Sequence, residues 1–551
     1  MLLGTTTNRN GGCLLKYALY GLPCAGKTTL LDGLSISVIH GSAELNRMAS
    51  GRFLDLPDEE KNELRIRYAD SLKARTDSFI SDGHYSFLND VVFTDADGDL
   101  YDVFIYLYCE PEVLRERLQH SDKNSRFAEI PVERIRKWQR FEIEGLREAC
   151  HRRRKDFYVV KDITAEKLQT FISEIENGFS SYTLAEHIAE QIMRIYPEPC
   201  EIHICDGDKT IIEQDSFRIC TDGYITHMFD GSFYTGYQSL LFTNETEHLR
   251  YDTEKLRTIS RNDMIYNMIS DKSYVILSSG IKMLWEQLAE LLELKNVIAD
   301  TLISAETKFF TVKLLQEKGY TVTAYGDGKN DLYMLKQADH GSLYIGKYLS
   351  RSLRNADVSG VKLLYDKSAY VLADADASAV DDIAICRSNS GINGARLAAA
   401  HIRLGRKLGE VMYSFIPNTD TAVIVLERGG RFFGDGVYTG FGGTFYSCDP
   451  KTSDLPMILE STVIIVDSVI NTGRSVLDMI DRLKRQRSDI EIFIAANVIQ
   501  EKAVGLLSEY KVFAVRTSAN SFVGCRQAEQ KDGKGPDTAD RLFNYIDRKE
   551  K

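Results

Sequence analysis

The sequence predicts an α/β protein built from three doubly wound parallel-sheet domains in tandem. The main observation is a repeated pattern in which a short apolar run leads into a small polar or acidic loop. It occurs at residues 14–29, 202–210, 320–331 and 461–475. In a parallel sheet the carboxyl ends of neighbouring strands lie together, so such loops can meet in one site. The length of 551 residues also favours several domains over one core.

Composition narrows the class of protein further. Hydrophobic residues make up 43% and charged residues 27% of the chain, as in ordinary soluble globular proteins. A net charge of −12 argues against a general nucleic-acid binder. No apolar run approaches membrane-spanning length, and the first residues are too polar for a secretory signal. The ten cysteines form no CxxC pair, so we expect neither a disulfide framework nor a zinc site, and a cytoplasmic location.

The first loop carries a phosphate-binding pattern. Residues 21–29 read GLPCAGKTT, which is GxxxxGK[ST] between an apolar run and a helical segment. Its glycines let backbone N–H groups close around phosphates at a helix N-terminus. Lys27 is expected to reach the β- and γ-phosphates of ATP and Thr28 to hold Mg²⁺. The candidate ATP-binding residues of this loop are Gly21, Gly26, Lys27, Thr28 and Thr29.

After the phosphate-binding loop, an acid at a strand end, Asp82 in SDGHY, is followed by the apolar run 103–108 and a basic tract from residue 115 to residue 140. This order of segments resembles the small P-loop kinases of the adenylate-kinase and nucleoside-kinase type. The resemblance implies that Asp82 positions Mg²⁺-bound water or the acceptor, and that Arg117 and Arg126 contact the migrating phosphoryl group from a lid. Asp82-Gly83-His84-Tyr85-Ser86 stands where the family has DGFPR, which leaves the acceptor open.

The second pattern lies near the middle of the chain. Asp206-Gly207-Asp208-Lys209-Thr210 follows one apolar run, and Gly326-Asp327-Gly328-Lys329-Asn330-Asp331 follows another. The pair resembles the haloacid-dehalogenase-type phosphohydrolases of the phosphoserine-phosphatase-like branch. By this resemblance Asp206 is the nucleophile, Asp208 is the general acid–base, and Thr210 supports the loop. Mg²⁺ would be held by the Asp206 carboxylate, the Asp208 carbonyl, Asp327 and Asp331.

Two further elements of that family occur in order. The apolar run 274–277 ends in Ser278 and Ser279, which are expected to contact phosphate together with Asn330. Lys308 would neutralise the phosphate and the nucleophile, with Lys313 as its rival. A small cap would span about residues 211–273. Its aromatic residues either line a substrate pocket or pack in the core: Phe229, Phe233, Tyr234 and Tyr237.

In the C-terminal third, the apolar run 461–466 leads into DSVINTGRS, which suits a ribose-5-phosphate because a carboxylate can take ribose hydroxyls while loop groups take the phosphate. This part of the chain resembles the type I phosphoribosyltransferases, and uracil phosphoribosyltransferases in particular. An earlier strand ends in Arg428-Gly429, similar to the pyrophosphate turn. DTADRLF near the end is similar to GDxGDRxF. The candidate PRPP-binding residues are Arg428, Gly429, Asp467, Asn471, Thr472, Gly473, Arg474, Ser475 and Asp540.

Two departures from that family bear on activity. The segment after Arg428 is poor in basic residues, which leaves Arg431 as a substitute for the cations that neutralise pyrophosphate. Residues 522–535 replace the compact base-recognition loop. The domains expected are a P-loop kinase at 14–160, a helical linker at 161–198, a phosphohydrolase at 199–375 and a phosphoribosyltransferase at 376–551.

These resemblances imply a multifunctional enzyme of nucleotide metabolism that uses Mg²⁺, ATP and PRPP, with pyrimidine salvage and UMP formation as its setting. Small nucleotides, nucleosides or bases are the expected partners, rather than nucleic acid or membrane. Any homo-oligomer is expected to form through the phosphoribosyltransferase-like domain. Two alternatives stay open. One is a polynucleotide 5′-kinase/3′-phosphatase of end repair, and the other is a regulator that senses ATP and PRPP with an inactive transferase domain.

Overall fold

The computed structural model divides into two compact units. They comprise residues 1–343 with 360–362, and residues 344–359 with 363–551. Within them the structure describes residues 14–226, 233–346, 353, 356–366, 369–416, 420–452, 455–520, 523–524 and 535–546. Three sheets of five or six strands organise these residues, together with a two-stranded ribbon, β4 (Ser86–Phe87) and β5 (Asp90–Val91). Every strand pairing resolved within the three large sheets is parallel, which confirms the predicted fold class.

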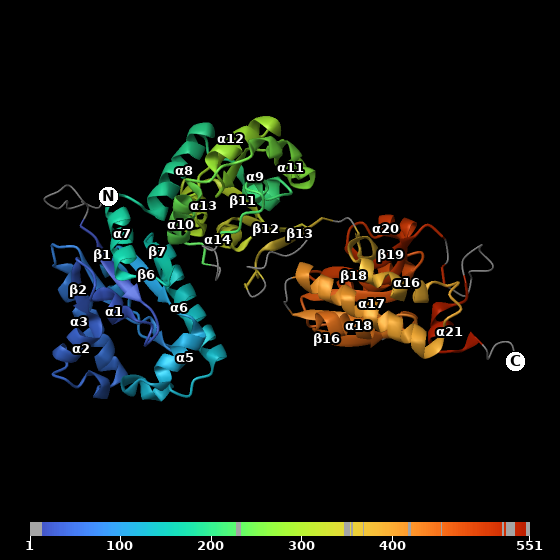
Figure 1. The fold of residues 1–551 in the computed structure, drawn as a ribbon, viewed down its shortest axis with the longest axis horizontal. Helices are drawn as coiled ribbons and strands as arrows, with labels where there is room; N and C mark the ends of the chain where they lie inside the picture. The colour runs from blue at the N-terminus through green and yellow to red at the C-terminus, as the bar shows by residue number, and fades with distance from the viewer. Residues whose placement is uncertain are drawn as a thin grey trace. The chain divides into compact units, whose positions relative to one another are not determined.

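The first sheet contains the predicted phosphate-binding loop. Across the sheet its strands are β2 (Ser37–His40), β3 (Phe79–Asp82), β1 (Lys16–Tyr20), β6 (Val103–Tyr108) and β7 (Asp156–Lys161). Alternate residues of β1 enter different cores: Tyr17 and Leu19 pack on one face, and Ala18 and Tyr20 on the other. Helices therefore cover both faces of the sheet, as the doubly wound prediction requires (Figure 1).

The helices of this part follow the strands in the expected alternation. They are α1 (Lys27–Leu31), α2 (Gly41–Met48), α3 (Asp58–Lys73), α4 (Asp95–Leu100), α5 (Pro111–Gln119), α6 (Val132–Arg153) and α7 (Ala165–Glu176). Helix α7 buries Leu168, Phe171 and Ile172 in the core of the first sheet. It is therefore part of this domain, although it lies within the segment 161–198 expected to act as a linker.

Most of the second sheet belongs to the same unit, which leaves out the end of β12 and most of β13. Its strands are, in order, β10 (Val297–Ala299), β9 (Tyr274–Ser278), β8 (Glu201–Cys205), β11 (Thr321–Gly326), β12 (His340–Ile345) and β13 (Lys362–Tyr365). Its helices are α8 (Ser181–Ile195), α9 (Ser216–Cys220), α10 (Gly236–Thr246), α11 (Asp263–Ile269), α12 (Lys282–Leu291), α13 (Ala305–Glu317) and α14 (Lys329–Gln337). Helix α8 packs against α13 through Ala185, so the second half of the expected linker belongs to this sheet (Figure 1).

Helix α10, from the expected cap, packs on the P-loop domain instead of standing free. Thr235 and Gln238 bond the backbone of Val159 on β7, with Val159 N–H donating to Thr235 Oγ1 at 3.2 Å and Gln238 Nε2 donating to Val159 O at 2.7 Å. Because β7 is an edge strand, these side chains satisfy backbone groups that would otherwise be unpaired. The Tyr237 ring lies 4.7 Å from that of Phe171. Tyr237 is therefore a packing residue, whereas Phe229 lies outside the described residues.

The third sheet forms the core of the other unit. Its strands are β14 (Tyr370–Val371), β19 (Lys511–Ser518), β18 (Glu491–Gln500), β17 (Thr462–Ile470), β15 (Thr421–Leu426) and β16 (Thr444–Cys448). The helices are α15 (Leu372–Ala375), α16 (Val380–Cys386), α17 (Gly394–Phe415), α18 (Arg431–Phe441), α19 (Arg474–Gln486), α20 (Glu501–Leu506) and α21 (Thr538–Leu542). Since β14 pairs with β19, the chain enters this sheet before residue 376, the expected boundary.

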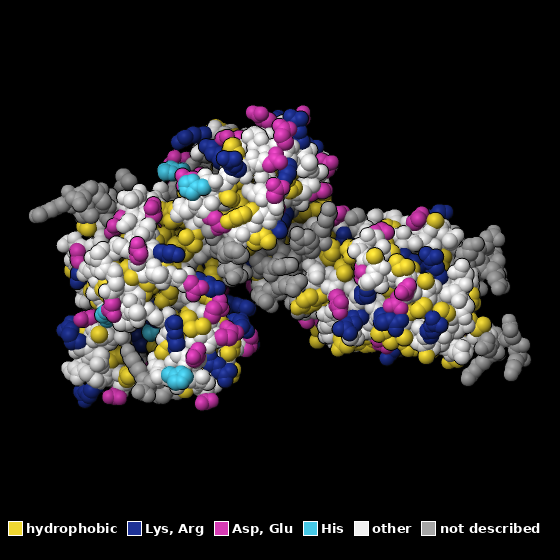
Figure 2. Space-filling view, in the orientation of Figure 1, with side chains coloured by type: hydrophobic (Ala, Val, Ile, Leu, Met, Phe, Trp, Pro, Cys, Tyr) yellow, Lys and Arg dark blue, Asp and Glu magenta, His cyan; other side chains and the backbone are white. Residues whose placement is uncertain are grey.

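The surface carries mixed charge. Figure 2 shows Lys and Arg side chains interspersed with Asp and Glu over the visible face of each sheet-based part. Among the described helices, none combines the length and apolarity needed to cross a membrane.

Candidate active sites

Three neighbouring strands of the second sheet bring the predicted phosphohydrolase loops together. β8 lies between β9 and β11 and runs parallel to both. Asp206 follows β8, Ser278 ends β9, and Asp327 follows β11. Since the strands are parallel, their carboxyl ends share one edge of the sheet. The two acid-bearing loops, separated by more than a hundred residues, therefore meet there.

Lys308 lies at the centre of this site. Its Nζ is 2.5 Å from Asp206 Oδ1 and 2.7 Å from Asp331 Oδ1, and its side chain is fully buried. Burial alone would lower the pKa of Lys308, but the two carboxylates outweigh it and raise the pKa. Lys313, the rival candidate, instead donates to His151 O at 2.7 Å. Of the two lysines, only Lys308 contacts Asp206.

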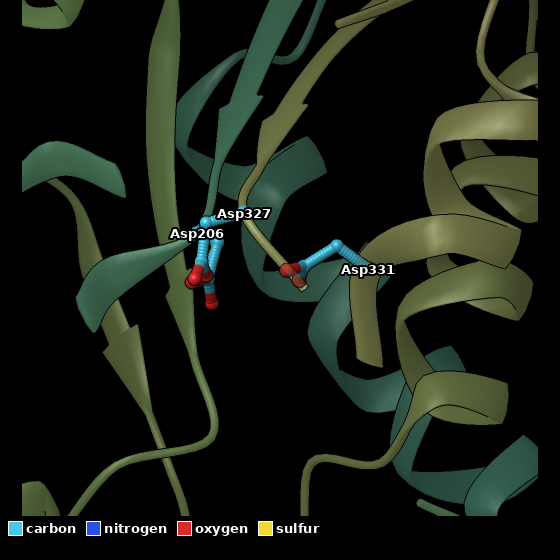
Figure 3. A group of neighbouring side chains, drawn as sticks. All are labelled: Asp206, Asp327 and Asp331. Carbon is cyan, nitrogen blue, oxygen red and sulfur yellow. The ribbon is translucent and has the colours of Figure 1, made fainter. Parts of the chain in front are cut away.

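Three carboxylates surround a space suited to a cation. One oxygen each from Asp206, Asp327 and Asp331 lies within 4.8 Å of the others. Figure 3 shows the Asp206 and Asp327 side chains next to one another at the strand ends, with Asp331 directed toward them from α14. Carboxylate oxygens are the ligands that Mg²⁺ prefers, and one lysine leaves three carboxylates incompletely neutralised. The donor set therefore fits a divalent cation.

The two aspartates of the first loop differ in their surroundings. Burial, reinforced by Asp331, raises the pKa of Asp206 to about 6, although Lys308 acts in the opposite direction. Burial, reinforced by Asp215, raises the pKa of Asp208 to about 7. Asp208 Oδ1 also accepts a hydrogen bond of 2.5 Å from the Ser216 backbone N–H. This hydrogen bond favours the carboxylate and so opposes the effect of burial on the pKa of Asp208.

The remaining predicted residues of this site lie around the loop. Ser278 is buried, and its Oγ accepts from the Gly280 backbone N–H at 3.1 Å. Asn330 donates to Ser279 Oγ at 2.7 Å, which ties α14 to the loop after β9. Thr210 is fully buried at the end of the first loop. The Asp206 loop needs glycine at position 207, because a β-carbon there would lie 2.5 Å from Ser278 Oγ.

The P-loop contains two glycines that its backbone conformation requires. Gly26 has a φ of 100°, in the left-handed region that glycine adopts without strain. A β-carbon at Gly21 would lie 2.8 Å from Leu107 O. Lys27 is buried, and its Nζ donates to Gly21 O at 2.5 Å and Leu22 O at 3.2 Å, so it lies against the loop. Thr28 and Thr29 are exposed at the start of α1.

Of the other residues predicted for the kinase site, Asp82 and Arg117 lie beside the P-loop or its strand, whereas the described contacts of Arg126 lie elsewhere. Asp82 is paired with Leu19 in the register of β3 and β1, so it lies beside the strand that leads into the P-loop. Its carboxylate accepts a hydrogen bond from the Gly41 backbone N–H at 2.8 Å. Arg117 Nη1 donates to Cys24 O at 3.2 Å and so reaches the P-loop. Arg126 instead stacks on aromatic rings, 4.6 Å from that of Phe127. None of its described contacts is with the P-loop.

A buried acid in this domain had no signal in the sequence. Glu142 on α6 is fully buried and accepts from the Ser86 backbone N–H at 2.8 Å and from Tyr106 OH at 3.1 Å. Burial raises the pKa of Glu142 to about 7, against the opposing effect of Lys27. The residue lies within a helix rich in charged residues, and its partners are 36 or more positions away. Periodicity alone therefore did not distinguish it from a solvated glutamate.

In the third sheet, adjacent strands bring the predicted ribose and pyrophosphate elements together. β17 pairs with β15, and Asp467 lies on β17 near the Arg428-Gly429 turn after β15. A β-carbon at Gly429 would lie 3.7 Å from Asp467 Oδ1. Burial raises the pKa of Asp467 to about 7. Arg428 Nη2 lies 3.2 Å from Asp540 Oδ1, so two predicted residues 112 positions apart are in contact.

The loop after Asp467 leads into α19 through a glycine in the left-handed region. Gly473 has a φ of 75° and caps α19, and Thr472, Arg474 and Ser475 are exposed beside it. Asn471 Nδ2 donates to Val523 O at 3.1 Å, which anchors the loop. Arg431, the substitute cation, lies within 3.5 Å of Glu427 and Asp435. Most of the segment 522–535 lies outside the described residues.

The first sheet and its loop define a P-loop domain. A family model described as an AAA domain matches residues 18–138, well under half of the chain. No curated protein matches the chain. Similar solved structures include shikimate kinase from Acinetobacter baumannii in complex with shikimate, at 18% identity and a TM-score of 0.24, covering 29% of this chain and 92% of that one.

Two other solved structures are also similar to part of the chain. Xanthine-guanine-hypoxanthine phosphoribosyltransferase from Helicobacter pylori is 16% identical with a TM-score of 0.21, covering 28% of this chain and 91% of that one. A phospho-aspartyl intermediate analogue of phosphoserine phosphatase is 15% identical with a TM-score of 0.19, covering 27% and 87%. All these TM-scores are below 0.5, so the likenesses carry no weight on function.

Proposed function

We propose that the chain is a multifunctional enzyme of nucleotide metabolism, and that its best-supported activity is Mg²⁺-dependent hydrolysis of a phosphomonoester through an aspartyl-phosphate on Asp206. The observation that carries this is the placement of Lys308 between Asp206 and Asp331 within the cluster of three carboxylates. A buried lysine without a charged partner would cost free energy of folding, and three neighbouring carboxylates without a cation would repel one another. The arrangement suits a site that receives both a cation and a phosphate dianion.

The proposed reaction has two displacements. Asp206 attacks phosphorus, the bond from phosphorus to the ester oxygen breaks, and Asp208 gives its proton to that oxygen. Water then attacks the phosphorus of the aspartyl-phosphate, Asp208 takes a proton from that water, and the bond from phosphorus to the Asp206 oxygen breaks, which releases inorganic phosphate and regenerates the Asp206 carboxylate. Mg²⁺ bound by Asp206, Asp327 and Asp331 would reduce the repulsion between the carboxylate and the phosphate. Lys308 and the Ser278 hydroxyl would bind the phosphate oxygens.

The test is hydrolysis of p-nitrophenyl phosphate and a panel of nucleoside monophosphates by the full chain with Mg²⁺. We expect Asp206→Asn to lower the rate by roughly a thousandfold or more, because the nucleophile is lost. Asp222→Asn is the matched control, since Asp222 is an exposed aspartate of the same part of the chain. Both variants should unfold at the wild-type temperature. Hydrolysis by Asp206→Asn at the wild-type rate would refute the proposed nucleophile.

The P-loop domain is proposed to transfer the γ-phosphoryl group of ATP to a nucleoside or nucleotide. The position of Asp82 beside β1 and the contact of Arg117 with the P-loop support this assignment. Thr28 would hold Mg²⁺ there, and Lys27 would turn from the loop carbonyls to the phosphates. Because phosphorylation and hydrolysis oppose one another, the two sites need different substrates or a control that separates them.

The third domain is proposed to bind PRPP and to transfer its phosphoribosyl group to a pyrimidine base, with uracil giving UMP. The closeness of Asp467 to the Arg428-Gly429 turn supports a PRPP site. A second candidate is a PRPP sensor without transfer. It is favoured by the engagement of Arg428 with Asp540 and of Arg431 with Glu427, which leaves less positive charge for pyrophosphate. Incorporation of radiolabelled uracil into UMP would support the transferase. PRPP binding without incorporation would support the sensor.

A further inference from the structure

Helix α6 of the P-loop domain extends to the phosphohydrolase part of the same unit. Its middle is anchored in its own domain, because Gln139 Nε2 donates to Cys109 O at 2.8 Å and Glu142 bonds the backbone of Ser86. One to three turns further along the same helix, residues 144–151 contact α13 and α14. The helix is continuous from Val132 to Arg153. Its two sets of contacts are therefore rigidly linked.

Arg147 makes the central contact of this interface. Its Nε lies 2.9 Å from Glu306 Oε1, with side chains 3% and 0% exposed. Its Nη1 also bonds Tyr333 OH and lies 3.2 Å from Glu144 Oε1. The guanidinium carbon is 4.5 Å from the centre of the Tyr333 ring. This guanidinium therefore joins one residue of α13 to one residue of α14.

Those two helices carry two residues of the proposed phosphatase site, Lys308 on α13 and Asp331 on α14. Glu306 is in the first turn of α13, two residues before Lys308. Tyr333 is on α14, two residues after Asp331. The contact extends along α13, because the His151 ring stacks on Phe309 at 3.7 Å, and Phe309 follows Lys308 directly. The P-loop domain thus contacts both helices through α6.

We propose that Arg147, a residue of the P-loop domain, is a positioning residue for phosphomonoester hydrolysis in the neighbouring domain. Through Glu306 it holds the start of α13, and so sets the position of the Lys308 amine between Asp206 and Asp331. Through Tyr333 it holds α14 and the Asp331 carboxylate. The phosphatase site is then incomplete without the P-loop domain. This inference rests on the proposed hydrolase function.

The physical reason is that a small displacement matters at this site. Lys308 reaches its two carboxylates over 2.5 and 2.7 Å, and a shift of 1 Å in a catalytic group can cost about a hundredfold in rate. A buried guanidinium with three polar partners has a fixed direction that an apolar contact does not reproduce. Phosphate binding is shared between Lys308 and the Ser278 hydroxyl in the proposed site, so a small displacement of the Lys308 amine removes only part of it. Loss of Arg147 should therefore affect turnover more than affinity.

The experiment compares four full-length variants in phosphomonoester hydrolysis. We expect Arg147→Met to lower kcat by roughly 10- to 100-fold with KM changed less than about threefold. Arg147→Lys keeps the charge but not the forked geometry, so its kcat should lie between those of Arg147→Met and the wild type. Arg152→Met is the matched control on the same helix, because Arg152 is exposed and pairs only with Glu148 among its described contacts. It should keep the wild-type kcat and KM.

The double variant Arg147→Met/Glu306→Met separates positioning from folding. Removing both charges leaves no unpaired buried carboxylate, so thermal unfolding should return close to the wild-type temperature. Positioning predicts that kcat stays low in this folded protein. Full recovery of kcat along with stability, or wild-type kcat in Arg147→Met, would overturn the inference. A different outcome would refute the proposed hydrolase function itself: the wild type hydrolyses no phosphomonoester, or its hydrolysis is unaffected by Asp206→Asn. That outcome can be told apart from the two that overturn the role of Arg147.

Discussion

Lys308 and its carboxylates show how strongly one residue's state depends on its partners. A lysine with a fully buried side chain would lose its proton if it stood alone, yet Asp206 and Asp331 hold it charged. The same lysine only partly neutralises the three acids around it, and burial raises the pKa of Asp327 well above its ordinary value, reinforced by Asp206 and Asp331. The cluster therefore gains stability from a bound cation, which is the state that the proposed chemistry requires.

Asp467 gives a pH-dependent prediction at the residue scale. In the unfolded chain an aspartate titrates near its usual pKa of about 4, whereas burial raises the pKa of Asp467 to about 7 in the folded protein. The folded state binds the proton more tightly between these values, so stability contributed by this group falls as pH rises from about 4 to about 7. We expect Asp467→Asn to be more stable than the wild type at pH 8, by on the order of 1 kcal/mol because the side chain is only half-buried.

The measurement is urea unfolding at pH 4, 6 and 8, with the two proteins converging at pH 4. Calorimetric titration with PRPP should show weaker binding by Asp467→Asn, since the carboxylate no longer accepts from ribose hydroxyls. Asp481→Asn, an exposed aspartate on α19, should follow the wild type in both measurements. A stability gain that is equal at pH 4 and pH 8 would rule out titration of Asp467 as the cause.

At the scale of elements, helices α17 and α18 pack with their backbones in contact. A β-carbon at Gly405 of α17 would lie 2.2 Å from Phe433 O, and one at Gly436 of α18 would lie 2.2 Å from Ile402 O. Gly409 and Gly440 repeat the arrangement one turn further on. Small residues at a four-residue spacing on both helices permit this approach. Because α18 begins directly after the Arg428-Gly429 turn, the packing also places that turn.

We therefore expect Gly436→Ala to destabilise this unit by about 1–3 kcal/mol, because the added methyl group meets backbone that cannot move aside. Gly505→Ala in α20 is the matched control, since no atom lies within 4 Å of a β-carbon there. Alanine at this exposed helical position should be neutral or stabilise by about 0.5 kcal/mol. Denaturant midpoints of the full chain measure both. An unchanged midpoint for Gly436→Ala would contradict the described contact between the helices.

At the scale of the whole molecule, two candidate sites share one compact unit and the third has its own. The P-loop follows β1 of the first sheet, and the Asp206 loop follows β8 of the second. The domains that carry them are joined by Arg147 and by the bonds of Thr235 and Gln238 to β7. These contacts link the scaffolds, whereas the phosphate-binding groups of each site come from separate sheets.

Lys27→Ala tests this separation. We expect it to abolish phosphoryl transfer from ATP, because the amine that binds the β- and γ-phosphates is lost. Phosphomonoester hydrolysis should stay within about twofold of the wild type, since α6 and its contacts with α13 are unaffected. Both activities are measured on one preparation, with the exposed Lys73→Ala as the control. Loss of both activities together would show misfolding or a dependence between the sites.

Much of the fold and part of each site followed from local sequence. An apolar run followed by glycine, serine, threonine or aspartate predicts a strand and a ligand-binding loop, because backbone geometry imposes both. The meeting of the Asp206 and Asp327 loops followed as well, since parallel strands place all such loops at one edge. The predicted domain limits agree less well with the structure than the predicted strands do. The helices α7 and α8 have similar amphipathic patterns, and only their packing assigns them to different sheets.

The sequence by itself determined the kinds of loop in this protein and the chemistry that their residues can perform. Only the tertiary structure decided which lysine contacts Asp206, that α10 covers the edge of the first sheet, and that Arg147 meets Glu306 from 159 positions away. The pattern that predicts a strand or a helix is the spacing of apolar residues along the chain, so the local sequence contains it. A contact between distant residues depends on how the elements pack, and nothing in the local pattern around Arg147 distinguishes it from an exposed arginine.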